Sequence, residues 1–154
     1  MRTRGLLLVV LAFFSVLSGC SSLTLEQANF AWPVESVLAV NSMNMIEDGR
    51  YALAVNVTPL AVAEFQDSTA LWGTTLRIIR NAQGYYFITG PRFKHVYVFR
   101  PGDGSLHGTT AIEVSTTGLT NPALNQRPPH IELLDGTAPP RYLTNSDIAQ
   151  ERRQ

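Results

Sequence analysis

Residues 93–116 contain two β-compatible runs on either side of a Pro-Gly-Asp-Gly turn at positions 101–104. In the first run, alternation places Phe93, His95, Tyr97 and Phe99 on one face and Lys94, Val96, Val98 and Arg100 on the other. A period of two residues is typical of a β-strand, and an Asp-Gly pair between two such runs indicates a tight turn. We therefore expect an antiparallel hairpin in this part of the chain.

Two further hairpins are predicted upstream on the same grounds. One spans residues 37–57 and turns at Glu47-Asp48-Gly49, and the other spans residues 74–90 and turns at residues 81–84. Within residues 51–57, the larger apolar side chains alternate with alanine and asparagine, as expected for a strand. The 11 glycines and 9 prolines of the chain also favour short strands and turns over long helices.

The segment 58–71 allows two interpretations. It is either a short helix, with Thr58 as N-cap and Pro59 at the first helical position, or a further strand. We expect residues 35–117 to form a mainly β domain of six or seven antiparallel strands, with one short helix across it. The predicted architecture is a sandwich or a small, partly open barrel.

Residues 118–154 are expected to form an extended, Pro-rich C-terminal tail. Prolines at positions 122, 128, 129, 139 and 140 disfavour regular structure, and only residues 130–134 have the composition of a strand. Thr144 and Asp147 have the spacing of a capping box, which favours a short terminal helix. The alternative for this terminus is a frayed polar segment.

The N-terminal residues 1–19 have the three parts of a secretory signal. Two arginines precede an apolar run at residues 6–16, and small residues follow it. This run is shorter than the roughly 20 apolar residues that a membrane-spanning helix needs. Residues 17–20 then read Leu-Ser-Gly-Cys, and Cys20 is the one cysteine of the chain.

The segment 17–20 resembles the lipobox of bacterial lipoproteins at every position. The resemblance implies that the signal is removed before Cys20, whose thiol takes a diacylglycerol and whose new amine is acylated. Residues 20–34 would then be a lipidated tether, and no other cofactor is expected. Ser21 implies the outer membrane where the organism has two membranes. The alternative is an ordinary secreted protein with an incidental cysteine, which has no partner for an intrachain disulfide.

The charge balance argues against a nucleic-acid partner. Loss of Arg2 and Arg4 with the signal leaves ten of the twelve basic residues against twelve acidic ones. Between Asp67 and Asp103, however, there is no acidic residue, and cations are interleaved with aromatic residues. This region is a candidate site for an anionic partner. The candidate residues are Arg77, Arg80, Arg92, Lys94, Arg100, Tyr85 and Tyr97. The alternative is an aromatic core face backed by a solvated, cationic face.

The sequence indicates neither a metal site nor a catalytic site. Its three histidines are His95, His107 and His130, and it has no Gly-x-Ser-x-Gly motif. We therefore expect a non-catalytic, membrane-anchored envelope lipoprotein whose β domain contacts another envelope component, either a protein or the cell wall. The first alternative is a binding module for a small ligand or an anionic glycan, using residues 72–100. The second is a hydrolase with an unrecognised site.

Overall fold

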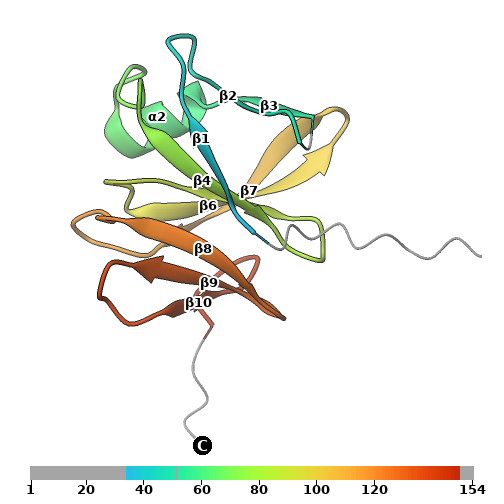
Figure 1. Ribbon diagram of the computed structural model, residues 1–154, viewed down its shortest axis with the longest axis vertical. Coiled ribbons are helices and arrows are strands. Elements are labelled where there is room, and N and C mark those ends of the chain that lie inside the picture. Colours follow the sequence, from blue (N-terminus) through green and yellow to red (C-terminus); the bar gives the residue numbers. More distant parts are fainter. Residues whose placement is uncertain (1–33, 51, 150–154) are drawn as a thin grey trace, which may run out of the picture.

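The computed structural model describes residues 34–50 and 52–149, and within them it is mainly β (Figure 1). The strands are β1 (Ser36–Ala39), β2 (Met45–Asp48), β3 (Leu53–Asn56), β4 (Thr75–Arg80), β5 (Tyr86–Thr89), β6 (His95–Gly102), β7 (Ser105–Glu113), β8 (Pro122–Arg127), β9 (His130–Asp135) and β10 (Arg141–Leu143). A single short helix, α2 (Thr58–Phe65), interrupts them in the described part of the chain.

The strands form three antiparallel sheets. The largest has the order β1-β4-β5-β6-β7, and the others are the pair β2-β3 and the meander β10-β9-β8. The predicted fold class, a mainly β antiparallel protein with one short helix, is confirmed. Residues 35–117 hold seven strands, β1–β7, as expected, and β8, β9 and β10 follow in the C-terminal segment; the sheets do not close into a barrel.

All three predicted turns connect paired strands. The hairpins are β2–β3, β4–β5 and β6–β7. The run at residues 37–40 was expected to belong to the first hairpin, but β1 pairs instead with β4, so that Val37 lies opposite Arg77. This pairing joins segments 40 positions apart, which a local pattern does not reveal.

Helix α2 confirms the helical interpretation of residues 58–71, although it begins one residue earlier than expected. Thr58 is already helical, and Val57 occupies the N-cap position without a side-chain hydrogen bond. Pro59 lies in the first turn, where a missing backbone N–H costs nothing. The helix ends at Phe65, followed by the C-cap Gln66, which is left-handed at φ 57°, and it buries Leu60 and Ala61.

The C-terminal segment is more regular than expected, because β8, β9 and β10 together form a sheet over residues 122–143. Its prolines lie where strands tolerate them. Pro122 begins β8, Pro128 and Pro129 form the β8–β9 turn, and the last two precede β10. Residues 144–149 form a turn closed by Thr144 and Asp147 rather than a helix. The rest of the predicted terminal helix lies outside the described residues.

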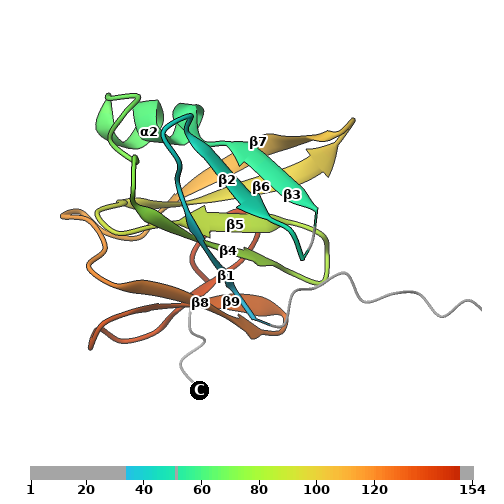
Figure 2. The ribbon, with the colours of Figure 1, turned by 45° about the horizontal axis from the view of Figure 1, so that its top comes forward.

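The five-stranded sheet is the middle layer of the molecule (Figures 1 and 2). The meander β8–β10 lies on one side of it, and α2 with the β2–β3 hairpin lies on the other (Figure 2). Gln126 on β8 donates a hydrogen bond to the carbonyl of Arg80 on β4, and Arg141 on β10 donates to the carbonyl of Val114. The C-terminal sheet is therefore an integral layer of the fold.

A buried ionic network joins β1 to the β2–β3 hairpin. The Asp48 carboxylate accepts a hydrogen bond from the Ser36 hydroxyl at 2.5 Å and pairs with the Arg50 guanidinium at 2.8 Å. The side chain of Asp48 is only 3% exposed, whereas that of Arg50 is 63% exposed. Hydrogen bonds from Arg50, and then from Ser36, hold the pKa of Asp48 well below its usual value although burial opposes them.

Asp48→Asn is expected to lower the free energy of unfolding at pH 7 by about 1.5 kcal/mol, because hydrogen bonds to a charged group are lost. A carboxylate with a depressed folded pKa stabilises the fold above the unfolded pKa of 3.8, and this contribution fades as the pH falls further. The difference between the two proteins should therefore shrink between pH 5 and pH 2 in urea unfolding. A constant difference, or an equal effect of Asp103→Asn in the exposed β6–β7 turn, would contradict the assignment.

Candidate functional site

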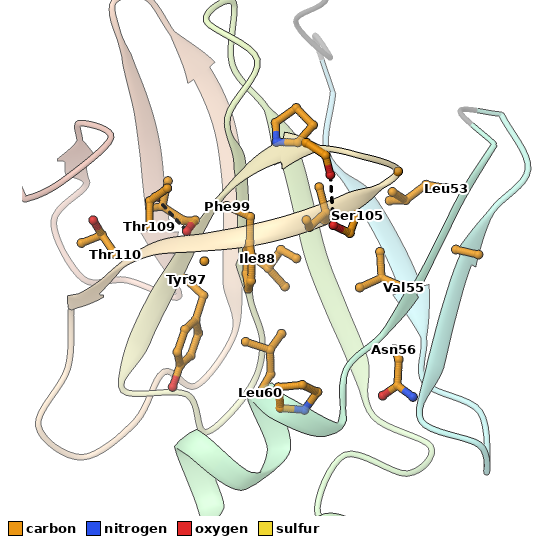
Figure 3. Close-up of a pocket in the computed structure, with 18 of the residues that line it drawn as sticks. Leu53, Val55, Asn56, Leu60, Ile88, Tyr97, Phe99, Ser105, Thr109 and Thr110 are labelled. Carbon is orange, nitrogen blue, oxygen red and sulfur yellow. Dashed lines mark hydrogen bonds between the residues drawn. The ribbon is translucent and has the colours of Figure 1, made fainter.

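In the described part of the molecule, an open groove of about 1190 Å³ lies on the α2 side of the five-stranded sheet. Its walls are β3, α2 and the β6–β7 hairpin, and β5 contributes to its floor (Figure 3). Most of its lining is apolar, notably Leu53, Val55, Leu60, Ile88, Phe99 and Leu106. Polar groups come from Asn56, Tyr97, Ser105, Thr109 and Thr110.

Both the β2–β3 pair and the large sheet supply side chains to the groove. On β3, Leu53 and Val55 are half-buried and Ala54 and Asn56 are exposed, and all four line the groove. On the large sheet, Ile88, Tyr97 and Ala111 lie in one cross-strand row and all line the groove. Directly paired residues of antiparallel strands share a face, so this row is the groove face of the sheet.

The two faces of β6 are used differently from either sequence interpretation. Val96 and Val98 are completely buried, whereas Tyr97 and Phe99 are half-buried and line the groove. Phe93, which precedes the strand, is buried in the core. The aromatic face of β6 is therefore largely the groove face, and its valines supply the deepest packing.

A buried carboxylate fixes α2 against β6 beside the groove. The Glu64 side chain on α2 is only 1% exposed. One of its oxygens accepts the Tyr97 hydroxyl at 2.8 Å and lies 3.0 Å from His95 Nδ1. The other accepts the backbone N–H of Lys94. Three neighbouring groups of one strand segment thus converge on one helical side chain.

This arrangement keeps the Tyr97 phenol protonated. Burial, and then its hydrogen bond to the Glu64 carboxylate, raise the pKa of the Tyr97 phenol well above its usual value. Tyr97 therefore stays neutral and donates a hydrogen bond to the Glu64 carboxylate. The contacts among Glu64, His95 and Tyr97 support a structural connection between α2 and the groove wall.

The structure separates the predicted cationic residues instead of gathering them in the groove. Arg77 and Arg80 are three residues apart on β4 and so lie on opposite faces. Arg77 pairs with Glu35 at 2.7 Å, and Arg80 lies 5.3 Å from the centre of the Tyr86 ring. Arg92 stacks on Phe65 at 4.9 Å.

The remaining predicted site residues lie in different places. Lys94 and Arg100 are exposed at the two ends of the β6 region, and Tyr85 is packed against the core. Tyr97 is the one predicted site residue that lines the groove. Asp103, and no cation, supplies formal charge to the groove lining among the described residues.

The histidines also lie apart. The register places His107 opposite Arg100, at the turn end of the β6–β7 hairpin, and His95 opposite Glu113 at its other end. His107 Nε2 lies 3.1 Å from the Ser105 hydroxyl and 3.2 Å from the Gly102 carbonyl. No cluster of three potential metal-binding side chains occurs in residues 34–50 and 52–149.

Sequence analysis missed Glu64 and most of the groove. The available signal was one acid within the otherwise apolar segment at residues 60–65, together with His95 and Tyr97 on one strand face. Cys20 and the tether lie outside the described residues. Within the described part, no helix is long and apolar enough to cross a membrane. Comparison with protein-family models, curated proteins and solved structures finds no match.

Proposed function

We propose that this protein is a non-catalytic bacterial envelope lipoprotein that binds another envelope component in the groove between β3 and β7. Its anchor is the diacylglycerol and N-acyl chain carried by Cys20, in the outer membrane where the organism has two membranes. The partner is an envelope protein of an assembly, secretion or surface structure. The membrane anchor keeps the groove close to such partners.

The open, apolar groove is the observation that carries this proposal. Leu53, Val55, Leu60 and Phe99 give it a surface that gains free energy when an apolar partner excludes water. The groove is also bordered by strands rather than loops, so its walls are positioned by the sheets and by the Glu64 contacts of α2. A rigid, apolar surface is suited to binding a partner rather than to catalysis.

The charge of the groove lining disfavours the alternative in which an anionic glycan binds there. An anionic glycan needs cations, and Asp103 is the charged residue of the described lining. Lys94 and Arg100 remain exposed for such a ligand, but they lie outside the groove lining. No contact of the described residues favours the hydrolase alternative, which stays a prediction from sequence.

Thiol labelling in intact cells tests the groove contact. The variants are Ala111→Cys, an exposed position of the groove, and Ala138→Cys, an exposed position in the β9–β10 loop. Each supplies one reporter thiol, because the proposed acylation blocks Cys20. A membrane-permeant maleimide should label position 111 more slowly in cells than in the purified lipoprotein. Position 138 should react equally in both settings. Equal labelling of position 111 in the two settings would overturn the proposal.

A further inference from the structure

We propose that the groove binds an extended polypeptide segment of the partner, whose backbone pairs with the free edge of β7. This inference rests on the proposed function and adds the chemistry of the occupant. It is carried by the position of two strand edges, the register of β7 and the character of the lining.

The groove runs between two strand edges that have no strand partner on that side. Among the described residues, β7 pairs only with β6 and β3 pairs only with β2. Both strands line the groove (Figure 3). An edge strand presents backbone donors and acceptors that an extended peptide can satisfy by joining the sheet.

The turn between β6 and β7 fixes which backbone groups reach the free edge. Asp103 and Gly104 have φ values of 47° and 74°, as in a type I′ turn. They connect the directly paired residues Gly102 and Ser105. In a two-residue hairpin this flanking pair is hydrogen-bonded, and non-hydrogen-bonded pairs alternate with hydrogen-bonded ones along the ladder.

Leu106 and Gly108 therefore direct their backbone N–H and C=O groups away from β6. Leu106 lies opposite Pro101, which has no N–H to donate, and Gly108 lies opposite Phe99. Both edge residues line the groove. The outward groups are thus placed where an inserted strand would meet them.

The lining suits an apolar strand in particular. Gly108 and Ala111 carry little or no side chain, so another backbone can approach the β7 edge closely. Leu53, Val55 and Leu60 on the facing wall can receive alternate apolar side chains. Asp103 at the turn end favours a basic residue at that end of the segment. The regular part of this edge, residues 105–108, ends at a register irregularity at Thr109 and extends about 10 Å at roughly 3.3 Å per residue, so it pairs with about three or four partner residues.

A matched pair of variants separates backbone pairing from general apolar contact. Gly108→Pro removes an N–H that the β6–β7 ladder does not use, whereas Gly108→Ala retains it. A Cβ at position 108 would meet the Phe99 ring at 3.6 Å, an ordinary contact, and Gly108 has no left-handed φ. Both variants should therefore fold, which circular dichroism and thermal unfolding check.

The binding test uses a library of random octapeptides, selected on the intact lipoprotein in detergent. Recovered peptides should alternate apolar residues and bind Gly108→Pro at least tenfold more weakly than wild type. Their affinity for Gly108→Ala should change less than twofold. In the wild-type protein, bound peptide should slow amide hydrogen exchange at Leu106 and Gly108, a readout that does not depend on either variant.

Three results would overturn strand addition. One is equal peptide affinity for both variants without protection of Leu106 and Gly108. The second is binding of dodecanoate, used as an apolar probe, where the library yields no peptide. The third is a wild-type dimer that Gly108→Pro dissociates, which would make a second copy the occupant. None of these three results changes the expected thiol labelling of the groove. Full labelling of Ala111→Cys in cells, by contrast, would show that no partner occupies the groove.

Discussion

Cys20→Ala is expected to abolish incorporation of labelled palmitate and to release the protein from the membrane fraction. Leu17, Ser18 and Gly19 before Cys20 resemble a lipobox, and in the proposed lipoprotein the sulfur of Cys20 takes the diacylglycerol. Two or three acyl chains anchor a protein durably, at about 0.8 kcal/mol for each buried methylene, so their loss should be visible as an all-or-none change.

Ser21→Ala is the matched control, because it changes the neighbouring residue and leaves the thiol in place. It should retain palmitate and remain in the membrane fraction. Undiminished palmitate in Cys20→Ala would show that the lipobox interpretation is wrong. Release of both variants would instead point to a defect in export.

Glu64→Ala is expected to lower the free energy of unfolding by about 3 kcal/mol, because it leaves buried donors without an acceptor. The Lys94 backbone N–H and the Tyr97 hydroxyl both donate to this carboxylate. Glu64→Gln should cost only about 1 kcal/mol, since an amide oxygen still accepts one bond and the amide nitrogen can donate to the phenol oxygen.

Urea unfolding of the two variants measures this difference, with Glu47→Ala, at an exposed position of β2, as the control. The control should remain close to wild type, because its carboxylate is exposed. An equal loss in Glu64→Ala and Glu64→Gln would contradict the role of the hydrogen bonds. A loss in Glu64→Ala no larger than that of the control would show that the carboxylate does not hold α2 on the sheet.

The hairpins were predictable because their signals are local. Alternation in residues 93–100 and an Asp-Gly pair specify strand and turn within a few residues of each other, and β6–β7 follows. The partner of β1 was not predictable in this way. Its pairing with β4 depends on burial shared by distant segments, as when Ser36 lies opposite Ile78.

The C-terminal sheet shows how proline can mislead a local argument. Proline is disfavoured in the interior of a sheet, but it is tolerated at the first position of a strand and in turns. Pro122 takes the first position of β8, and the β8–β9 turn absorbs Pro128 and Pro129. Between them, Leu124 is fully buried and anchors the strand in the core.

The surroundings of the predicted cationic site were unpredictable for a different reason, because acids distant in the sequence lie beside its residues in the fold. Residues 68–102 contain no acid, yet an acid-free stretch of sequence is not an acid-free environment. Glu35, the residue before β1, pairs with Arg77, and Glu64 on α2 contacts His95. Both acids lie outside the stretch, so only the folded arrangement reveals that these cationic and aromatic residues have local partners.

The groove could be anticipated only in part, through the aromatic face of β6. Tyr97 and Phe99 were grouped correctly by alternation, but nothing in their spacing indicates that β3 and α2 leave this face partly uncovered. The groove exists because the β2–β3 pair and the β6–β7 hairpin belong to different sheets. Such a relation depends on packing among three segments.

The most direct measurement of the central claim is the labelling rate of Ala111→Cys in cells divided by its rate in the purified lipoprotein. Normalised to the same ratio for Ala138→Cys, it should fall to one fifth or less, on the order of a 1 kcal/mol preference for the occupied groove. Partner occupancy of the groove predicts that protection. A normalised ratio of one would mean that the groove stays open to solvent in the envelope, and it would contradict the account.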